Sequence, residues 1–270
     1  TAWIDGNGTL RQRLGELQSG ADNGVWARMF GGKLGGDEFT NKYKTYQLGY
    51  DAQAGEWRVG AAYEYSDGSL NYTSGSGENK IGAISLYGTL QGKDNSVVKR
   101  GRIYGDMDIY GKYSDQGDYS TDATSIGVEY SKRFDGGNNV YFEPQAQLTF
   151  GRIDGYDYVS AKGIRVAYDD INSLIGRLGI VGGKAFSRGD VYVKASLLHE
   201  FSGDSSVTML AANGESYMED QDYGDTWLEV GIGGNITLGK NCELYGEVER
   251  SFGGDVTKNW GANVGFRYSF

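Results

Sequence analysis

The sequence has one cysteine, one proline and one histidine in 270 residues. A single cysteine, Cys242, excludes an internal disulfide and a cysteine-based metal site. Scarce proline suits closed β-sheet, because proline cannot donate to the hydrogen-bond ladder. With His199 alone, no metal constellation and no Gly-x-Ser-x-Gly motif, we expect no enzyme activity on external substrates.

Long hydrophobic runs are also missing. The mean hydropathy is −0.51, and no run approaches the roughly 18 apolar residues of a transmembrane helix. This excludes a helical membrane protein. It does not exclude a β-barrel, whose strands alternate lipid-facing apolar residues with polar lumen-facing ones.

The charge and the glycine content exclude further classes. A net charge of −10 argues against nucleic acid as a partner. Scattered Gly-x-Gly follows from the 45 glycines, so we expect no nucleotide or other cofactor. No signal peptide begins the chain, so a membrane barrel would need an export signal that was removed or lies upstream.

Alternation of apolar and polar residues is the main positive signal, and it is clearest at the C-terminus. Ala262, Val264, Phe266, Tyr268 and Phe270 fall on one face of a strand. The intervening polar residues fall on the other face. The pattern predicts one face toward lipid and one toward a polar lumen, and it puts His199 on the apolar face of its own strand.

The same alternation predicts an all-β fold of twelve antiparallel strands. They are expected at 24–34, 40–53, 55–67, 78–91, 100–115, 117–134, 138–155, 165–187, 189–202, 222–239, 241–252 and 258–270. Short turns rich in Gly, Asp and Asn are expected at 53–56, 91–95, 135–139, 187–190 and 239–241. Longer polar loops are expected at 67–78, 114–119, 154–162 and 203–222. Short turns at one rim and long loops at the other are typical of an outer-membrane barrel. The alternative is a soluble β-sandwich, which has shorter strands.

Two parts of the chain are expected: a linker and pore-spanning helix over 1–23 and a barrel over 24–270. Leu10, Leu14 and Leu17 form one stripe of a helix at 9–18, with Arg11 and Arg13 on its polar side. So short a helix is marginal in water and needs a host surface. A solvated linker is the alternative.

Five acids are expected in the lumen. We expect them to hold Arg11 and Arg13, each pair contributing about 1 kcal/mol. They are Glu143, Glu229, Glu243, Glu247 and Glu249.

Several segments together resemble a known family. They are residues 10–17 (LRQRLGEL), 25–28 (VWAR), 142–148 (FEPQAQL), 174–181 (LIGRLGIV), 244–250 (LYGEVER) and 263–270 (NVGFRYSF). In this order they resemble the translocator domain of monomeric type V autotransporters, especially the enterobacterial serine protease autotransporters.

The resemblance implies a monomeric twelve-stranded barrel in the bacterial outer membrane, with the N-terminal helix inside its pore. It implies an upstream passenger domain that is exported to the cell surface. It also implies insertion by the barrel-assembly machinery, which reads a final aromatic strand. Phe266, Tyr268 and Phe270 match that signal.

Some members of this family cut themselves at an asparagine inside the pore. Asp108 and Glu129 align with two of their acids, whereas Gln147 stands at the position of a third, and Asn7-Gly8 replaces the cleaved Asn-Asn pair. Asn7 followed by Gly is chemically suited to cyclisation. The preferred alternative is that the two acids pair with helix arginines or with lumen arginines, Arg152 and Arg177. The alternative function for the whole chain is a small outer-membrane porin or channel.

Overall fold

The computed structural model describes residue 12 and residues 23–37, 39–73, 75–90, 94–109, 115–202, 205–211, 213–221 and 225–270. Within these ranges, the side chains of residues 94–109, 115, 116, 205 and 219–221 are not described. The predicted helix at 9–18 falls outside the described residues except for Gln12, whose backbone is helical. No helix in the described part is long and apolar enough to cross a membrane.

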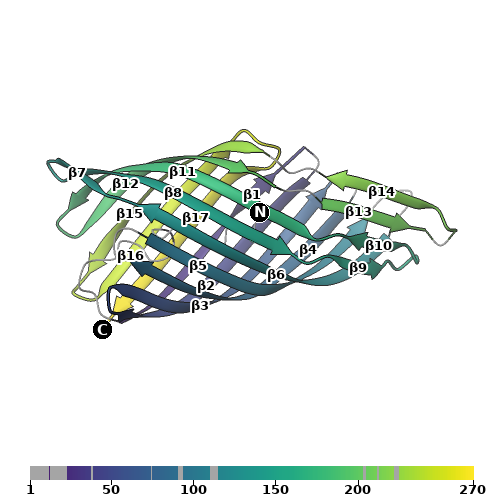
Figure 1. The fold of residues 1–270 in the computed structure, drawn as a ribbon, viewed down its shortest axis with the longest axis horizontal. Helices are drawn as coiled ribbons and strands as arrows, with labels where there is room; N and C mark the ends of the chain where they lie inside the picture. Colours follow the sequence, from purple (N-terminus) through teal and green to yellow (C-terminus); the bar gives the residue numbers. More distant parts are fainter. Residues whose placement is uncertain are drawn as a thin grey trace.

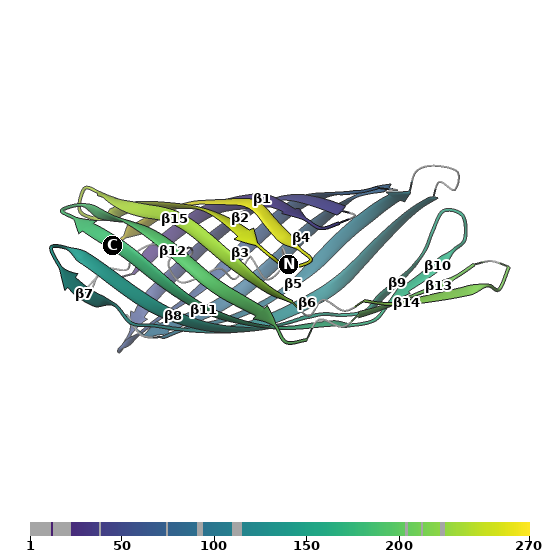
Figure 2. The same ribbon diagram turned by 90° about the horizontal axis from the view of Figure 1, so that it is seen from above.

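Antiparallel strands pair side by side and close into a ring (Figure 1, Figure 2). The main sheet has 13 strands, of which one, β7 (Phe134–Gly137), pairs only with its neighbour β8. The remaining twelve form the ring, as predicted. In ring order they are β1 (Gly24–Gly35), β2 (Phe39–Ala54), β3 (Trp57–Tyr72), β4 (Gly75–Leu90), β5 (Asp94–Ile109), β6 (Asp115–Ser131), β8 (Val140–Ile153), β11 (Ile171–Phe186), β12 (Gly189–Glu200), β15 (Thr226–Leu238), β16 (Cys242–Phe252) and β17 (Thr257–Ser269).

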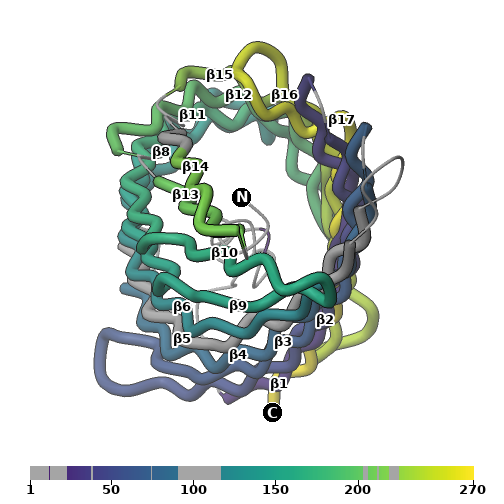
Figure 3. Tube along the Cα trace, turned by 90° about the vertical axis from the view of Figure 1, so that its right-hand side faces the viewer, coloured from purple at the N-terminus to yellow at the C-terminus, as the bar shows by residue number. Residues whose placement is uncertain are grey.

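The first and last strands close the ring. β1 pairs with β17 from Gly24 opposite Ser269 to Gly35 opposite Thr257, with one irregularity between Lys33 and Leu34. The chain therefore has no free sheet edge along the barrel wall in the part that the structure describes. End on, the Cα trace surrounds a central opening (Figure 3).

Short turns join the strands at the rim where the C-terminus lies. Between β7 and β8, Asn138 and Asn139 have φ of 53° and 62°. Two consecutive positive φ values are typical of the tight hairpin turn that matches strand twist, and asparagine tolerates them well. The short turns predicted at 53–56, 187–190 and 239–241 are confirmed, whereas the turn predicted at 135–139 is reduced to residues 138 and 139 because β7 precedes it. Residues 91–93 of the fifth predicted turn are not described.

Several predicted boundaries at the opposite rim are wrong. The expected loop at 67–78 is mostly strand, because β3 continues to Tyr72 and β4 begins at Gly75. Likewise β6 begins at Asp115, inside the expected loop at 114–119. At the short-turn rim, β5 begins at Asp94 rather than at residue 100. Beyond the apolar band both faces of a strand meet water, so alternation ends while the backbone ladder continues.

The wall has an inverted polarity. Along β2, Tyr46, Leu48 and Tyr50 point outward with exposed fractions of 49%, 64% and 47%. Gln47, between Tyr46 and Leu48, and Asp51, after Tyr50, point inward and are 4% and 0% exposed. A water-soluble sandwich would bury the first set and expose the second. The arrangement fits a barrel with lipid outside and polar groups within.

A second sheet extends from the rim away from the C-terminus (Figure 1, Figure 2). It has the order β14 (Ser216–Gln221), β13 (Ser205–Leu210), β10 (Arg165–Tyr168), β9 (Tyr156–Val159). The predicted strand at 165–187 is thus two strands, β10 and β11, and the predicted loops at 154–162 and 203–222 contain hairpin strands.

Stacked tyrosines join this outer sheet to the barrel. The ring of Tyr156 stacks on Tyr119 of β6 and on Tyr168 of β10, with centroids 4.3 Å and 4.8 Å apart. Burial, with smaller contributions from neighbouring tyrosines, raises the pKa of Tyr156, which therefore stays neutral. Packing of this kind holds the outer sheet to one side of the pore opening (Figure 3).

Some glycines are required by lumen aromatics on the neighbouring strand. A Cβ on Gly265 would lie 2.1 Å from the Tyr245 ring, and one on Gly49 would lie 2.2 Å from the Trp26 ring. Neither ring could lie flat against the wall if a side chain stood there. The high glycine content thus serves close packing of rings inside the barrel.

A charge placed on the outward apolar band should destabilise the barrel. We expect Leu48→Arg to cost about 2–4 kcal/mol of unfolding free energy, measured by denaturant titration in lipid vesicles, because the new charge faces hydrocarbon. Ser69→Arg has the same outward orientation on β3 but lies beyond the band, and should cost less than about 1 kcal/mol. Equal losses would contradict the assignment of the band.

Candidate functional site

The candidate site is the polar inner wall of the barrel. Its side chains come from alternate positions of strands that are distant in sequence, and the closed ring brings them together. Most of the charged ones are buried and are paired with groups on neighbouring strands. We describe the wall in three clusters, and then the outer face.

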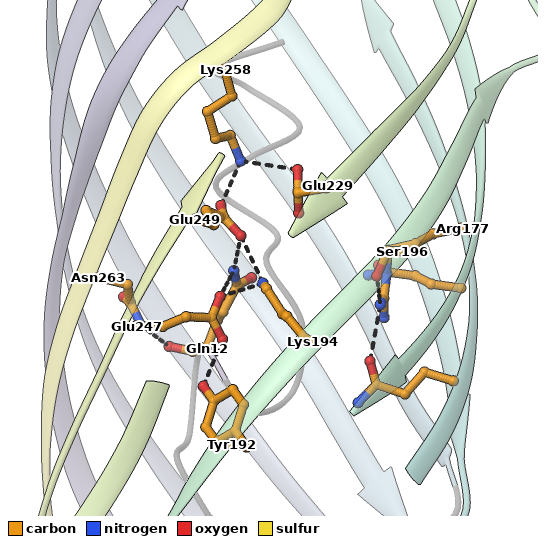
Figure 4. Close-up of polar contacts among 12 residues, drawn as sticks. Gln12, Arg177, Tyr192, Lys194, Ser196, Glu229, Glu247, Glu249, Lys258 and Asn263 are labelled. Carbon is orange, nitrogen blue, oxygen red and sulfur yellow. Dashed lines mark hydrogen bonds and ion pairs between the residues drawn. The ribbon is translucent and has the colours of Figure 1, made fainter. Parts of the chain in front are cut away.

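The first cluster contains Lys194, Lys258, Glu229, Glu247 and Glu249, and we call it the acid–lysine cluster (Figure 4). Lys194 Nζ pairs with Glu247 and lies 2.7 Å from Glu249 Oε2. Lys258 Nζ lies 2.6 Å from Glu249 Oε1 and 3.4 Å from Glu229 Oε2. Three carboxylates and two ammonium groups leave one formal negative charge on this part of the wall.

Gln12 lies against this cluster. Its amide Nε2 donates to Glu247 Oε1 at 2.7 Å and to Glu249 Oε2 at 3.1 Å. Its backbone carbonyl accepts a hydrogen bond of 2.9 Å from Asn263 Nδ2. A residue from before β1 is therefore held inside the barrel by β16 and β17 (Figure 4).

The predicted lumen acids do line the wall, and three of them pair with lysines of the barrel itself. Glu229, Glu247 and Glu249 pair with Lys194 and Lys258 of the barrel itself, lysines that the sequence analysis missed. Their inward positions on β12 and β17 were a signal that could have identified them. The expected partners Arg11 and Arg13 lie outside the described residues, as do Leu10, Leu14 and Leu17.

The two other predicted acids also lie on inward positions. Glu143 is 3.8 Å from the Nε of Arg133 and accepts a hydrogen bond from Gln145. Glu243 lies opposite Arg267 of β17 in the ladder.

The second cluster is centred on Asp51, which is fully buried. Its carboxylate accepts hydrogen bonds from Arg267 at 2.6 Å and 2.9 Å, from Arg58 at 2.8 Å and from the Tyr87 hydroxyl at 2.7 Å. The Tyr87 oxygen in turn accepts a 2.7 Å hydrogen bond from the Trp26 indole. Strands β1, β2, β3, β4 and β17 thus meet through one carboxylate, across the seam of the ring.

The third cluster surrounds Arg177. It donates hydrogen bonds of 2.9 Å to both Gln145 and Gln147, and its Nη2 lies 3.7 Å from Glu129 Oε2. Pairing of Glu129 with a lumen arginine, the preferred alternative to a cleavage role, is confirmed. The prediction that Arg152 also lies in the lumen is wrong. Its side chain is on the exposed face, where it pairs with Asp154 and Asp170.

The register separates Asp108 from Glu129. Asp108 pairs opposite Gln116, whereas Glu129 pairs opposite Asn95, thirteen positions away along β5. At roughly 3.3 Å per residue this is about 43 Å of strand. The prediction that these two acids serve one cleavage site is therefore wrong. The two positions also differ in face: an odd number of positions separates Asp108 from Asn95, so the register gives Asp108 outward parity, whereas the sequence pattern had placed it in the lumen. Asn7 lies outside the described residues.

The final strand presents its aromatics outward, as predicted. Phe266, Tyr268 and Phe270 are 40%, 40% and 54% exposed. Phe270 stacks with Tyr50 of β2, the centroids 6.5 Å apart, and its backbone N–H donates to Asn23 O at 2.9 Å. The last residue thus fastens the rim to the residue that precedes β1.

The predicted outward position of the histidine is confirmed. His199 is exposed on the outward face of β12, where its Nδ1 lies 2.6 Å from Thr226 Oγ1 and its ring meets Phe201 edge-on. Among the described side chains, no group of three or more His, Cys, Asp or Glu is placed to hold a metal ion.

Comparison with known proteins gives consistent matches. Residues 25–249 match the family described as "Autotransporter beta-domain". The pertactin autotransporter of Bordetella parapertussis is 29% identical over all of this chain, and the serine protease sat autotransporter of Escherichia coli is 27% identical over 97% of it. The chain spans 31% and 21% of the length of these relatives.

Solved structures agree with the sequence matches. The β-domain of the Bordetella autotransporter BrkA has a TM-score of 0.75 at 25% identity, covering 92% of this chain and 100% of that one. The translocator domain of NalP from Neisseria meningitidis has a TM-score of 0.77 at 13% identity, covering 100% and 96%, which shows a shared fold.

Removing the Asp51 carboxylate should weaken the seam. Asp51→Ala leaves Arg58 and Arg267 buried without their anion, and we expect a loss of about 3–5 kcal/mol. Denaturant unfolding followed by tryptophan fluorescence measures it. Glu56→Gln, which neutralises an exposed acid in the turn that follows β2, is the matched control and should leave stability unchanged. A loss no larger than that of the control would refute the role of Asp51.

Proposed function

The chain belongs to the autotransporter β-domain family, and from this premise we propose that it exports a passenger domain joined to its N-terminus. The family consists of outer-membrane β-barrels of Gram-negative bacteria, and the chain is such a barrel. The observation that carries the proposal is the position of Gln12 inside the pore.

The direction of the chain gives this contact its meaning. β1 starts with Gly24 at the short-turn rim, which faces the periplasm in such barrels. Gln12 precedes Gly24 by twelve positions, yet it contacts Glu247 and Glu249 of β16. Through β17, these two acids are level with Phe30 and Gly32 of β1, which lie well above the rim where β1 begins. Going backward from β1, the chain therefore leads from the inner rim up into the pore, as a translocated passenger would require.

The acid–lysine cluster is suited to hold such a segment after export. Its surplus of one negative charge favours hydrogen-bond donors and cations, and the segment around Gln12 carries Arg11 and Arg13. Each such hydrogen bond adds only about 1 kcal/mol net, because its groups would otherwise bond to water. The segment is thus held by several weak contacts, and it plugs the pore without being fixed irreversibly.

Export needs partners that the chain does not supply. We infer that the barrel-assembly machinery inserts it, reading the outward aromatics Phe266, Tyr268 and Phe270, and that it works as a monomer. The drive for export then comes from passenger folding outside the cell. What the passenger does is not encoded in these residues; the protease activity in the name of one relative belongs to that relative.

Self-cleavage is a narrower hypothesis, and its support is the sequence pair Asn7-Gly8. Glu129 is held by Arg177, and Asp108 lies at a different height. If cleavage occurs, its acids are not this pair.

A reporter protein joined before Thr1 tests export. In intact cells the reporter should be accessible to added protease, and Phe270→Ala should lower the amount at the surface more than it lowers the stability of barrels already formed. A reporter that stays inside while the barrel is in the membrane would refute export. On the same blot, a second band that disappears in Asn7→Ala would establish cleavage, and a single full-length band would exclude it.

Planar-bilayer conductance separates a plugged translocator from a porin. Deleting residues 1–20 should open a large conductance if the segment plugs the pore. Gln12→Glu places a carboxylate against Glu247 and Glu249 and should also raise conductance, whereas Gln12→Lys is attracted by them and should not. Unchanged conductance in the deletion would favour the porin alternative.

A further inference from the structure

Lysines gather on the outer face of β1 and β2, just beyond the apolar band. Lys42 and Lys44 are exposed and Lys33 is half-exposed. The ladder puts Lys33 of β1 directly opposite Lys42 of β2. Lys44 is two positions from Lys42 on the same strand and so shares its face. We call these three residues the outer lysine patch.

Nothing on the described surface neutralises this patch. Like charges directly opposite each other in a ladder destabilise a sheet. No ion pair forms between a described carboxylate and Lys33, Lys42 or Lys44, although Asp67 lies opposite Lys44 on β3. The side chain of Asp67 is also opposite Lys80 of β4. At this level the outward acids of β3 and β4 are Asp67 and Glu78, and Lys80 lies beside them. Four lysines with two acids leave an excess of positive charge that an external anion would relieve.

The patch lies at the level where a bilayer changes from hydrocarbon to headgroup. Below Lys44 on β2 come the outward Tyr46 and Leu48. Trp260 of β17, 52% exposed, lies opposite Lys33 on its other side. Tryptophan and tyrosine mark the membrane–water interface. Because this rim is the one away from the C-terminus (Figure 1), the interface is that of the outer leaflet.

The positive charge is local. On β6, two of the outward positions at the same rim are acidic, Asp118 and Asp122. Arg152 of β8 faces outward but is already paired with Asp154 and Asp170. At this rim, the outer lysine patch therefore contrasts with the acidic outward residues of β6 and with the paired arginine of β8.

We infer that the outer lysine patch binds the phosphate groups of an anionic lipid headgroup in the outer leaflet. A lysine ammonium is a compact charge that suits phosphate, and each lysine near an anionic lipid surface adds roughly a fivefold gain in affinity. The acyl chains of the lipid would lie along Tyr46, Leu48 and Met29. This site would fasten lipid beside the seam between β1 and β17. The inference rests on the outer-membrane location of the barrel and is independent of passenger export.

The test uses the full chain in neutral detergent with bisphosphorylated lipid A as the probe. Lipid A should raise the melting temperature of the parent and remain bound in native mass spectrometry. Lys33→Gln, Lys42→Gln and Lys44→Gln combined should weaken binding about 100-fold. Lys184→Gln, an exposed lysine on β11 at the opposite rim, is the matched control and should bind as the parent does.

Three outcomes would overturn the inference. They are unchanged binding by the triple variant, equal binding of dephosphorylated lipid A by the parent, or an equal thermal shift with inorganic phosphate alone. Misfolding does not hide the result, because relief of the repulsion between Lys33 and Lys42 should leave the triple variant at least as heat-stable as the parent when no lipid is present.

Discussion

Closure of the sheet between β1 and β17 is the constraint on which the rest of the structure depends. Hydrocarbon offers no hydrogen-bond partners, so every backbone group in the wall must pair with a neighbouring strand. A ring satisfies this condition only if the first and last strands meet in a definite register. That register, Gly24 opposite Ser269, determines which side chains face one another across the seam. The Asp51 carboxylate then joins Arg58 and Arg267 there, and Phe270 bonds to Asn23 at the rim.

Once the ring is closed, the inner wall must neutralise its own charges. A lumen side chain is largely removed from bulk water, so a carboxylate there needs a cation or several donors. The barrel supplies Lys194, Lys258 and Arg177 from its own strands. The pore segment, represented by Gln12, adds to a network that is already nearly balanced. This explains how a translocator can hold a segment in its pore and still have a stable wall without it.

The outside of the barrel follows a different rule. Apolar residues face lipid over the middle of each strand, and charges are confined to the rims. At the outer rim the strands continue past the band, and the sheet formed by β9, β10, β13 and β14 extends further. The stacking of Tyr156 on Tyr119 fixes that extension beside the pore. The outer lysine patch lies at this rim as well, next to the seam.

The sequence by itself determined the fold class, the number of barrel strands, most of the short turns and the face on which most strand residues lie, because alternation with a period of two is local. It thus predicted Glu247, Glu249 and Glu129 as lumen residues and Phe266 and Phe270 as outward ones. On β5, where apolar residues have inward parity, it placed Asp108 on the wrong face. It failed where both faces of a strand are polar, as at 67–78, since no alternation remains there. Only the tertiary structure decided which inward residues meet: Lys194 with Glu247, Asp51 with Arg267, and Asp108 far from Glu129. Whether a residue has an odd or an even position in its strand decides which face it lies on. Its height in the barrel and its partners follow from the register of the closed ring, and that register depends on strands far apart in sequence.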